Sequence, residues 1–194
     1  MENRFIIKED AQGTHQLNLS AFHTSEGRLF LNGSITSESV GKLIESMIYM
    51  SRNEIPITLF LDTNGGEARA GLALIDVIKI ISERIPVTIV CLSKAYSMGA
   101  IILAAGTKGR RYLLPHSEVM IHEPLIPSGA GGSASSVKST AESLMAMRDI
   151  ISKLLSEYTG KTQKAINEAM SHDHFLNAAE AIKFGIADAI IGKL

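Results

Sequence analysis

Two short apolar runs, each introduced by an Ile-Pro pair, dominate the pattern of the first half of the chain. They are residues 55–61 (IPITLFL) and residues 85–90 (IPVTIV). Short β-rich runs of this kind are typical of strands buried on both faces of a sheet. Residues 68–84 between them show helical spacing of apolar positions. The pattern therefore predicts a βαβ unit with parallel strands and a right-handed crossover.

The rest of the chain continues the alternation of short strands and helices. Residues 4–19 contain two extended runs around Ala11-Gln12-Gly13, which predict a hairpin. Further strands are expected at residues 29–32, 111–114 and 119–121, and further helices after Thr36, at 98–105, after Thr162 and from Asn177 to Gly185. The fold class is therefore α/β, and no linker divides the chain into two domains.

One predicted helix, residues 134–158, is long for a domain of this size. A glycine-rich joint at residues 128–132 precedes it and Gly160 ends it. At 1.5 Å per residue it extends about 35 Å. A helix of this length does not rest wholly on a small domain, so we interpret its free part as an oligomer contact. The alternative is a long helix of the core.

Composition and charge narrow the classes of function. The 194 residues carry 19 Lys+Arg and 20 Asp+Glu, without the basic excess of a nucleic-acid binder. No apolar stretch approaches the length of a membrane span, and the first residues do not resemble a secretory signal. We therefore expect a cytoplasmic protein, or an organellar one if a transit segment was removed. The single cysteine, Cys91, lies in an apolar run and excludes an internal disulfide.

Three segments place small or polar residues directly after an apolar run. They contain Gly65-Gly66, Ser97 and His122. In parallel α/β sheets, ligands collect beyond the carboxyl ends of the strands. A serine at a strand-to-helix turn suits a nucleophile, histidine is a base of suitable strength, and glycine amides can bind an oxyanion. Each also has an ordinary explanation, as a turn, a helix cap or a structural histidine.

A histidine base needs a carboxylate that fixes its tautomer. Asp149, Asp173 and Asp188 are the candidates in the C-terminal part, and spacing alone does not choose among them. The six histidines show no ligand spacing typical of a metal site, so no metal is expected.

The motifs together resemble the proteolytic subunit of the Clp protease, a serine peptidase family. The matching residues are Gly65-Gly66, Ala70-Gly71, residues 97–100 (SMGA), 104–109 (AAGTKG), 111–112, 114–115, 119–122 (VMIH), Pro124-Leu125, Asp173, Phe175-Leu176, 179–181, Gly185 and Asp188. The resemblance covers about residues 28–192 and is densest over 97–125.

The resemblance implies a role for each matching position. Ser97 aligns with the nucleophile, His122 with the base and Asp173 with the third member of the triad. The backbone N–H groups of Gly66 and Met98 align with the oxyanion donors. No metal and no cofactor are implied.

The resemblance also implies an architecture. The fold would be a crotonase-like spiral of βαβ units with a protruding handle helix at about residues 133–159. Residues 28–194 would form a single peptidase domain. Residues 1–27 match the family poorly, and their two extended runs predict a mobile N-terminal segment that is a candidate axial hairpin. Subunits of the family assemble into seven-membered rings that stack in pairs. An ATP-driven AAA+ unfoldase feeds them unfolded polypeptide, while the peptidase itself uses no ATP; neither a nucleic acid nor a membrane takes part.

Some positions depart from the family pattern. Thr63-Asn64 replaces Ser-Pro, Tyr96 replaces a small residue before the nucleophile, Glu123 replaces a glutamine, and Ser171-His172 replaces an acidic residue and an arginine. We expect Tyr96 to narrow the site or change residue preference. The alternatives are a non-catalytic ring subunit paired with an active paralogue, an enzyme of acyl-CoA thioesters on the same fold, and a related peptidase that works without an unfoldase.

Overall fold

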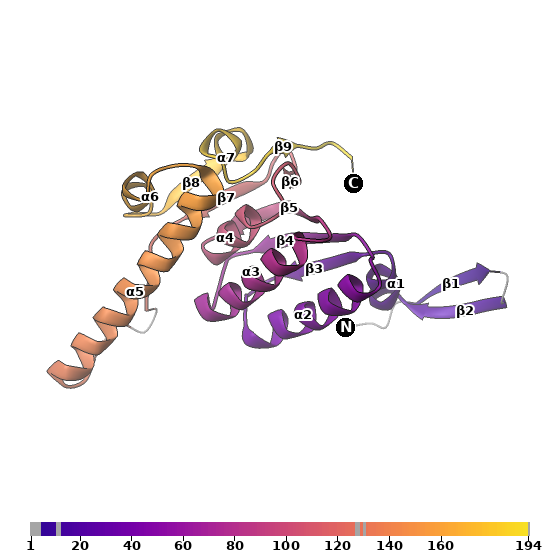
Figure 1. Cartoon of the computed structure of the whole chain (residues 1–194), viewed down its shortest axis with the longest axis horizontal. Coiled ribbons are helices and arrows are strands. Elements are labelled where there is room, and N and C mark those ends of the chain that lie inside the picture. The colour runs from indigo at the N-terminus through magenta and orange to yellow at the C-terminus, as the bar shows by residue number, and fades with distance from the viewer. Residues whose placement is uncertain (1–4, 11–12, 127–128, 130, 194) are drawn as a thin grey trace.

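The computed structural model describes all of the chain except residues 1–4, 11–12, 127–128, 130 and 194 (Figure 1). Its strands are β1 (Phe5–Asp10), β2 (Gly13–Asn18), β3 (Arg28–Asn32), β4 (Ile57–Thr63), β5 (Val87–Tyr96), β6 (Arg111–Leu113), β7 (Glu118–Ile121), β8 (His174–Asn177) and β9 (Ala189–Ile190). Its helices are α1 (Leu19–Ser25), α2 (Ser37–Arg52), α3 (Ala68–Ser82), α4 (Met98–Ala104), α5 (Ala134–Thr159), α6 (Gln163–Ala169) and α7 (Ala178–Phe184).

The main sheet is mostly parallel and forks along β5. Strands β3, β4, β5, β6 and β9 follow one another in parallel order. The first half of β5 pairs with β6, while residues Lys94–Tyr96 at its end pair with β7. Strand β8 then lies antiparallel to β7. The end of β5 and the strands β7 and β8 thus form a second branch of the sheet.

The predicted βαβ unit and α/β class are confirmed. Strands β4 and β5 are parallel, with Ile57 opposite Val87, and α3 connects them. Thr36 caps α2 through a reciprocal box with Ser39, and Asn177 caps α7 through a box with Glu180. Side-chain caps of this kind satisfy amide groups that a helix start leaves unpaired.

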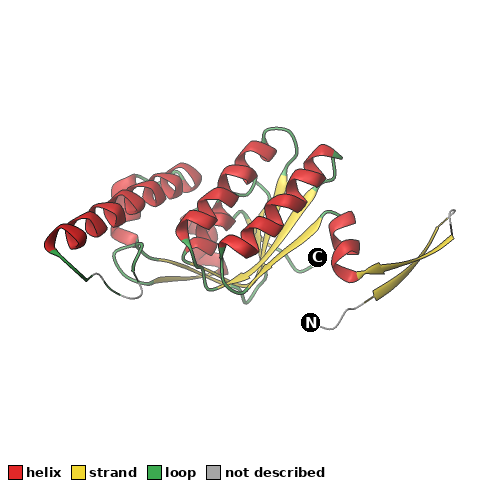
Figure 2. Ribbon diagram, turned by 90° about the horizontal axis from the view of Figure 1, so that it is seen from below, coloured by secondary structure: helices red, strands yellow, loops and turns green. Residues whose placement is uncertain are grey.

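The helices gather on one side of the main sheet, as Figure 2 shows. Aliphatic residues fill the space between the helices and the main sheet. The core is aliphatic because the chain has few aromatic residues. Helix α4 is the most deeply placed of these helices, with all seven of its residues buried. A Cβ atom at Gly71 of α3 would lie 2.1 Å from Cγ of Met98, so the glycine makes room for α4. The helix that begins after Ser97 is therefore fixed from all sides.

Helix α5 confirms the expected long helix. Only Ile151, Ser152 and Leu155, in its C-terminal half, are buried. Its N-terminal half extends away from the rest of the molecule (Figure 1). Gly160 ends the helix in the left-handed conformation. Ser128 and Ala130 of the predicted glycine joint lie outside the described residues.

Strands β1 and β2 pair antiparallel as expected, although the turn residues 11–12 lie outside the described part. Helix α1 and strand β9 were not predicted. Helix α1 was missed because it buries none of its residues, and so carries no apolar stripe. Strand β9 has only two residues, too few for a period. The division into residues 1–27 and 28–194 remains a prediction.

Among the helices that the structure describes, none combines the length and the apolar character needed to cross a membrane.

Candidate active site

The hydroxyl of Ser97 and the imidazole of His122 form a hydrogen bond. Oγ of Ser97 lies 2.7 Å from Nε2 of His122. Ser97 follows the end of β5, and His122 follows the end of β7, which pairs with β5. Two residues that are 25 positions apart in sequence thus meet because their strands are neighbours.

The backbone of Ser97 adopts a conformation that is unusual for a residue with a side chain. Its φ is 53° and its ψ is −121°. Such geometry is costly and persists only where the surroundings impose it. Here the Ser97 N–H donates to the carbonyl of Met120 at 2.7 Å, and its carbonyl accepts from the N–H of Ala100. The sharp turn between β5 and α4 directs the hydroxyl toward His122, as in a nucleophile elbow.

The register of β7 and β8 brings Asp173 to His122. In this antiparallel pair, Met120 lies opposite Phe175 and Ile121 opposite His174. One further step along the same register places His122 opposite Asp173. Oδ1 of Asp173 lies 3.7 Å from Nδ1 of His122. The two groups form an ion pair when the imidazole is protonated, but they are too far apart for a hydrogen bond.

The other two candidate carboxylates are occupied elsewhere. Asp188 accepts hydrogen bonds from Arg111, including one of 2.6 Å from Nη2. Asp149 pairs with Lys153 and accepts from Gln163 on the surface of α5 and α6. Of the three candidates that spacing left open, only Asp173 is paired with His122.

Gly65 and Gly66 bring a backbone segment close to Ser97. Their φ values are +95° and +153°, which side chains disfavour. A Cβ atom on Gly65 would lie 2.8 Å from Cβ of Ser97, and one on Gly66 would lie 2.1 Å from the carbonyl oxygen of Ile35. Ile35 donates to the Gly65 carbonyl and accepts from the N–H of Glu67. In that parallel bridge, the N–H of Gly66 points away from Ile35.

Met98 contributes its backbone rather than its side chain to this region. The side chain is 3% exposed and packs toward Gly71. As the first residue of α4, Met98 has an N–H group without an intrahelical acceptor. The predicted residues Ser97, His122 and Asp173 therefore lie together. The segment of Gly66 adjoins Ser97 in space, and Met98 follows Ser97 in sequence.

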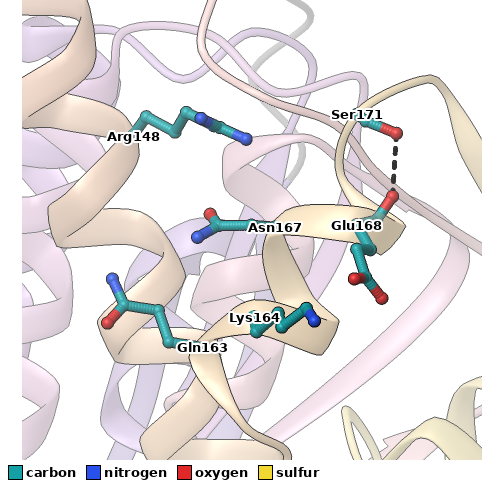
Figure 3. Close-up of a pocket in the computed structure, with 6 residues that line it drawn as sticks. All are labelled: Arg148, Gln163, Lys164, Asn167, Glu168 and Ser171. Atoms are coloured by element: carbon teal, nitrogen blue, oxygen red, sulfur yellow. Dashed lines mark hydrogen bonds between the residues drawn. The ribbon is translucent and has the colours of Figure 1, made fainter.

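A cavity of about 530 Å³, lined by polar and charged residues, lies between α5 and α6 (Figure 3). Its lining consists of Arg148, Gln163, Lys164, Asn167, Glu168 and Ser171. Arg148 also lies 3.1 Å from the carboxylate of Glu123, whose N–H donates to the carbonyl of Met170. The segment after His122 is thus attached to α5 and to the end of α6. Glu123, a departure from the family pattern, is engaged by an arginine.

Two residues near the site were missed or only partly understood from the sequence. Tyr96 donates a hydrogen bond to Glu118, and its ring meets the ring of Phe175 edge-on. No sequence pattern marked Glu118 as a residue near the site, because its position beside Tyr96 depends on the register of β5 with β7. That register is a tertiary property, which a single sequence does not display.

Comparison with known proteins identifies relatives of this chain. The profile of the Clp protease family matches residues 11–193. The chain is 33% identical over 190 residues to the ATP-dependent Clp protease proteolytic subunit 2 of Synechococcus sp. (strain CC9605), covering 97% of this chain and 94% of that protein. It is equally similar to the proteolytic subunit 1 of Synechococcus sp. (strain CC9902), with the same identity and coverage.

Proposed function

Because the chain belongs to the Clp protease family, we propose that it is itself an active serine endopeptidase, with Ser97 as nucleophile, His122 as base and Asp173 as orienting carboxylate. The single observation that carries this proposal is the 2.7 Å contact between Oγ of Ser97 and Nε2 of His122. A base within hydrogen-bonding reach is what a serine hydroxyl needs to become a nucleophile near neutral pH.

The reaction follows from this arrangement. His122 Nε2 takes the hydroxyl proton while Oγ of Ser97 forms a bond to the scissile carbonyl carbon. The N–H groups of Gly66 and Met98 stabilise the oxyanion of the tetrahedral intermediate. His122 then gives its proton to the departing amine as the C–N bond breaks, leaving an acyl group on Ser97. Water, activated by His122, hydrolyses that ester and restores the hydroxyl.

Asp173 assists by holding the imidazole tautomer with a proton on Nδ1 and by stabilising the imidazolium that forms. Its side chain is 63% exposed and stands 3.7 Å from Nδ1, so its contribution depends on a short approach toward His122. Apo sites are often looser than their working complexes.

We further propose that the subunit works in a closed seven-membered ring that can stack into a double ring, and degrades unfolded polypeptide supplied by an ATP-driven unfoldase. The exposed N-terminal half of α5 supports an assembled state, since Val137 and Met145 are apolar and uncovered there. The names of the two Synechococcus relatives include ATP dependence. A cytoplasmic location remains our expectation from the sequence.

A fluorophosphonate probe tests the catalytic proposal directly. The assembled protein should be labelled at Ser97, identified by peptide mass spectrometry, and should cleave a short fluorogenic peptide. Ser97→Ala should lose both properties, and His122→Ala should lose most of the labelling rate. Ser93→Ala, on the strand that leads to Ser97, is the matched control and should behave as the unchanged protein. An unlabelled Ser97 in the assembled particle would refute the proposal.

The exposed position of Asp173 also favours one alternative, a non-catalytic ring subunit that modulates an active paralogue. That alternative predicts an assembled particle that has no peptidase activity, whatever the assembly conditions. Activity of the pure protein on a fluorogenic peptide would exclude it.

A further inference from the structure

A row of side chains runs across the second branch of the sheet, next to the proposed triad. Tyr96 on β5 is paired with Met120 on β7, and Met120 is paired with Phe175 on β8. The buried neighbours Ala95, Val119 and Leu176 face the core, so alternation along the strands places this row on the opposite face.

The proposed triad forms the next row on the same face. His122 lies two residues beyond Met120, and Asp173 lies two residues before Phe175. Residues two apart on a strand lie about 7 Å apart and share a face. Ser97 follows Tyr96 directly, and the unusual backbone conformation of Ser97 brings its side chain into the same row. Contacts that hold the row of Tyr96, Met120 and Phe175 in place therefore also affect the distance between His122 and Asp173.

The rings of Tyr96 and Phe175 contact each other across Met120. Their centroids are 5.7 Å apart with an interplanar angle of 88°, a favourable edge-to-face arrangement. The hydroxyl of Tyr96 donates to Oε1 of Glu118 on β7. This hydrogen bond, with some help from burial, raises the pKa of Tyr96 to about 12, so the hydroxyl remains a donor at neutral pH. The Tyr96 ring is thereby held in place from β7 while it contacts β8.

Strand β8 needs such a contact more than its neighbours do. Among the strands in the described residues, β8 is paired with β7 alone, so its other edge is open. Phe175, on this face of β8, is 50% exposed. The ladder to β7 and the ring contact between Phe175 and Tyr96 both hold β8 near the strand that leads to Ser97.

We propose that Tyr96 and Phe175 act as a positioning pair that sets the approach of Asp173 to His122, an inference that rests on the proposed peptidase function. Tyr96 takes the place of the small residue usual before the nucleophile. In this chain the aromatic contact spans β5 to β8 and limits displacement of the Asp173 segment. Loss of the contact lets β8 move away from the imidazole while the hydrogen bond between Ser97 and His122 persists.

Kinetics of four variants and one control separate this role from others. Tyr96→Ala and Phe175→Ala should each lower kcat about tenfold to a hundredfold with little change in KM, because small displacements of catalytic groups are costly. The double variant should be no worse than either single variant, since both remove one contact. Tyr96→Phe retains the ring and should recover most of the rate. Tyr49→Ala, an exposed tyrosine on α2, is the control and should leave both constants unchanged.

Hydrogen exchange supplies a readout that does not require activity. The amides of residues 174–177 should exchange faster in Tyr96→Ala than in the unchanged protein, whereas those of β4 should not. If Tyr96→Ala does not fold, Phe175→Leu provides the same comparison because it keeps an apolar side chain but removes the ring.

The outcomes for the two proposals are distinct. Unchanged exchange of β8 with unchanged kcat in the variants would overturn the positioning pair, and so would a rise in KM alone, which would make Tyr96 a wall for substrate. An unlabelled Ser97 in the unchanged protein would overturn the peptidase instead, whatever β8 does. Additive losses in the double variant would also contradict a shared contact.

Discussion

Nδ1 of His122 and Oδ1 of Asp173 lie 3.7 Å apart, whereas Nε2 of the same ring lies 2.7 Å from Oγ of Ser97. The imidazole is therefore engaged closely on the side of the hydroxyl and loosely on the side of the carboxylate. The Ser97–His122 pair is built on buried strands, while Asp173 precedes an edge strand and is largely exposed. This asymmetry predicts unequal consequences of removing the two partners.

Asp173→Asn should lower kcat by about 100-fold, much less than Ser97→Ala, which should remove nearly all triad-dependent catalysis. The exposed carboxylate interacts with water as well as with His122, so its loss costs less than the loss of the nucleophile. Steady-state kinetics on a fluorogenic peptide measure both. Equal losses for the two variants would show that Asp173 is already closed onto His122 in the resting protein.

Gly65→Ala should reduce kcat by at least about 100-fold, because the added methyl would lie 2.8 Å from Cβ of Ser97 and 2.9 Å from the Tyr96 carbonyl oxygen. The backbone at φ +95° also resists a side chain. Gly41→Ala is the matched control, since nothing lies within 4 Å of its new methyl. In the interior of α2 it should stabilise the fold by about 0.5–1 kcal/mol and leave the rate unchanged. Peptide hydrolysis and thermal unfolding of both variants check this, and a fully active Gly65→Ala would contradict the close approach.

The pair of Arg111 and Asp188 should govern acid stability. Burial by itself would raise the pKa of Asp188, but the hydrogen bonds and charge of Arg111 and the N–H of Gly109 outweigh it and hold that pKa below its usual value of 3.8. A carboxyl with a lowered pKa in the folded state stabilises the fold above its unfolded pKa, and this contribution is lost as pH falls through the folded pKa.

Asp188→Asn should accordingly lower the free energy of unfolding by about 3 kcal/mol at pH 7, because it leaves the buried guanidinium of Arg111 without its counter-charge. The difference from the unchanged protein should shrink as the pH falls below 3.8. Urea unfolding from pH 7 down to pH 3 measures this. Asp149→Asn, at an exposed pair, is the control, and a difference as large as that of Asp188→Asn would argue against the assignment.

The thiol of Cys91 should be unreactive in the folded protein. It is fully buried, and that burial raises its pKa to about 12. Because the thiolate is the reactive form, a thiol reagent at pH 8 should neither modify the native protein nor inhibit hydrolysis. One equivalent should react after denaturation. Inhibition of the native protein by the reagent would contradict the serine chemistry proposed here.

Met145→Glu should weaken the assembly. Met145 lies on the uncovered half of α5 and is 60% exposed, so a charge there leaves the fold of the subunit intact but disfavours an apolar interface. Sedimentation should show a smaller particle than that of the unchanged protein. Glu142→Gln, one turn away on the same helix, controls for a change of charge at an exposed site. An unaltered particle mass would show that α5 is not an assembly surface at this position.

The elements that the sequence predicted well are those whose signals are local. Thr36, Asn177 and Gly185 marked helix ends through capping chemistry, and the Ile-Pro runs marked β4 and β5. The gathering of Ser97, His122 and Asp173 came from family resemblance, since spacing left three aspartates open. The contact of Tyr96 with Phe175 was out of reach because it depends on the pairing of β5, β7 and β8.

Helix α4 restricts movement of Ser97, because all seven residues of the helix are buried in the core. Under the proposed function, a switch between inactive and active forms is therefore expected to act on Asp173, by bringing its carboxylate closer to His122. Under the proposed assembly, a neighbouring subunit that contacts the exposed Asp173 would control activity without moving Ser97.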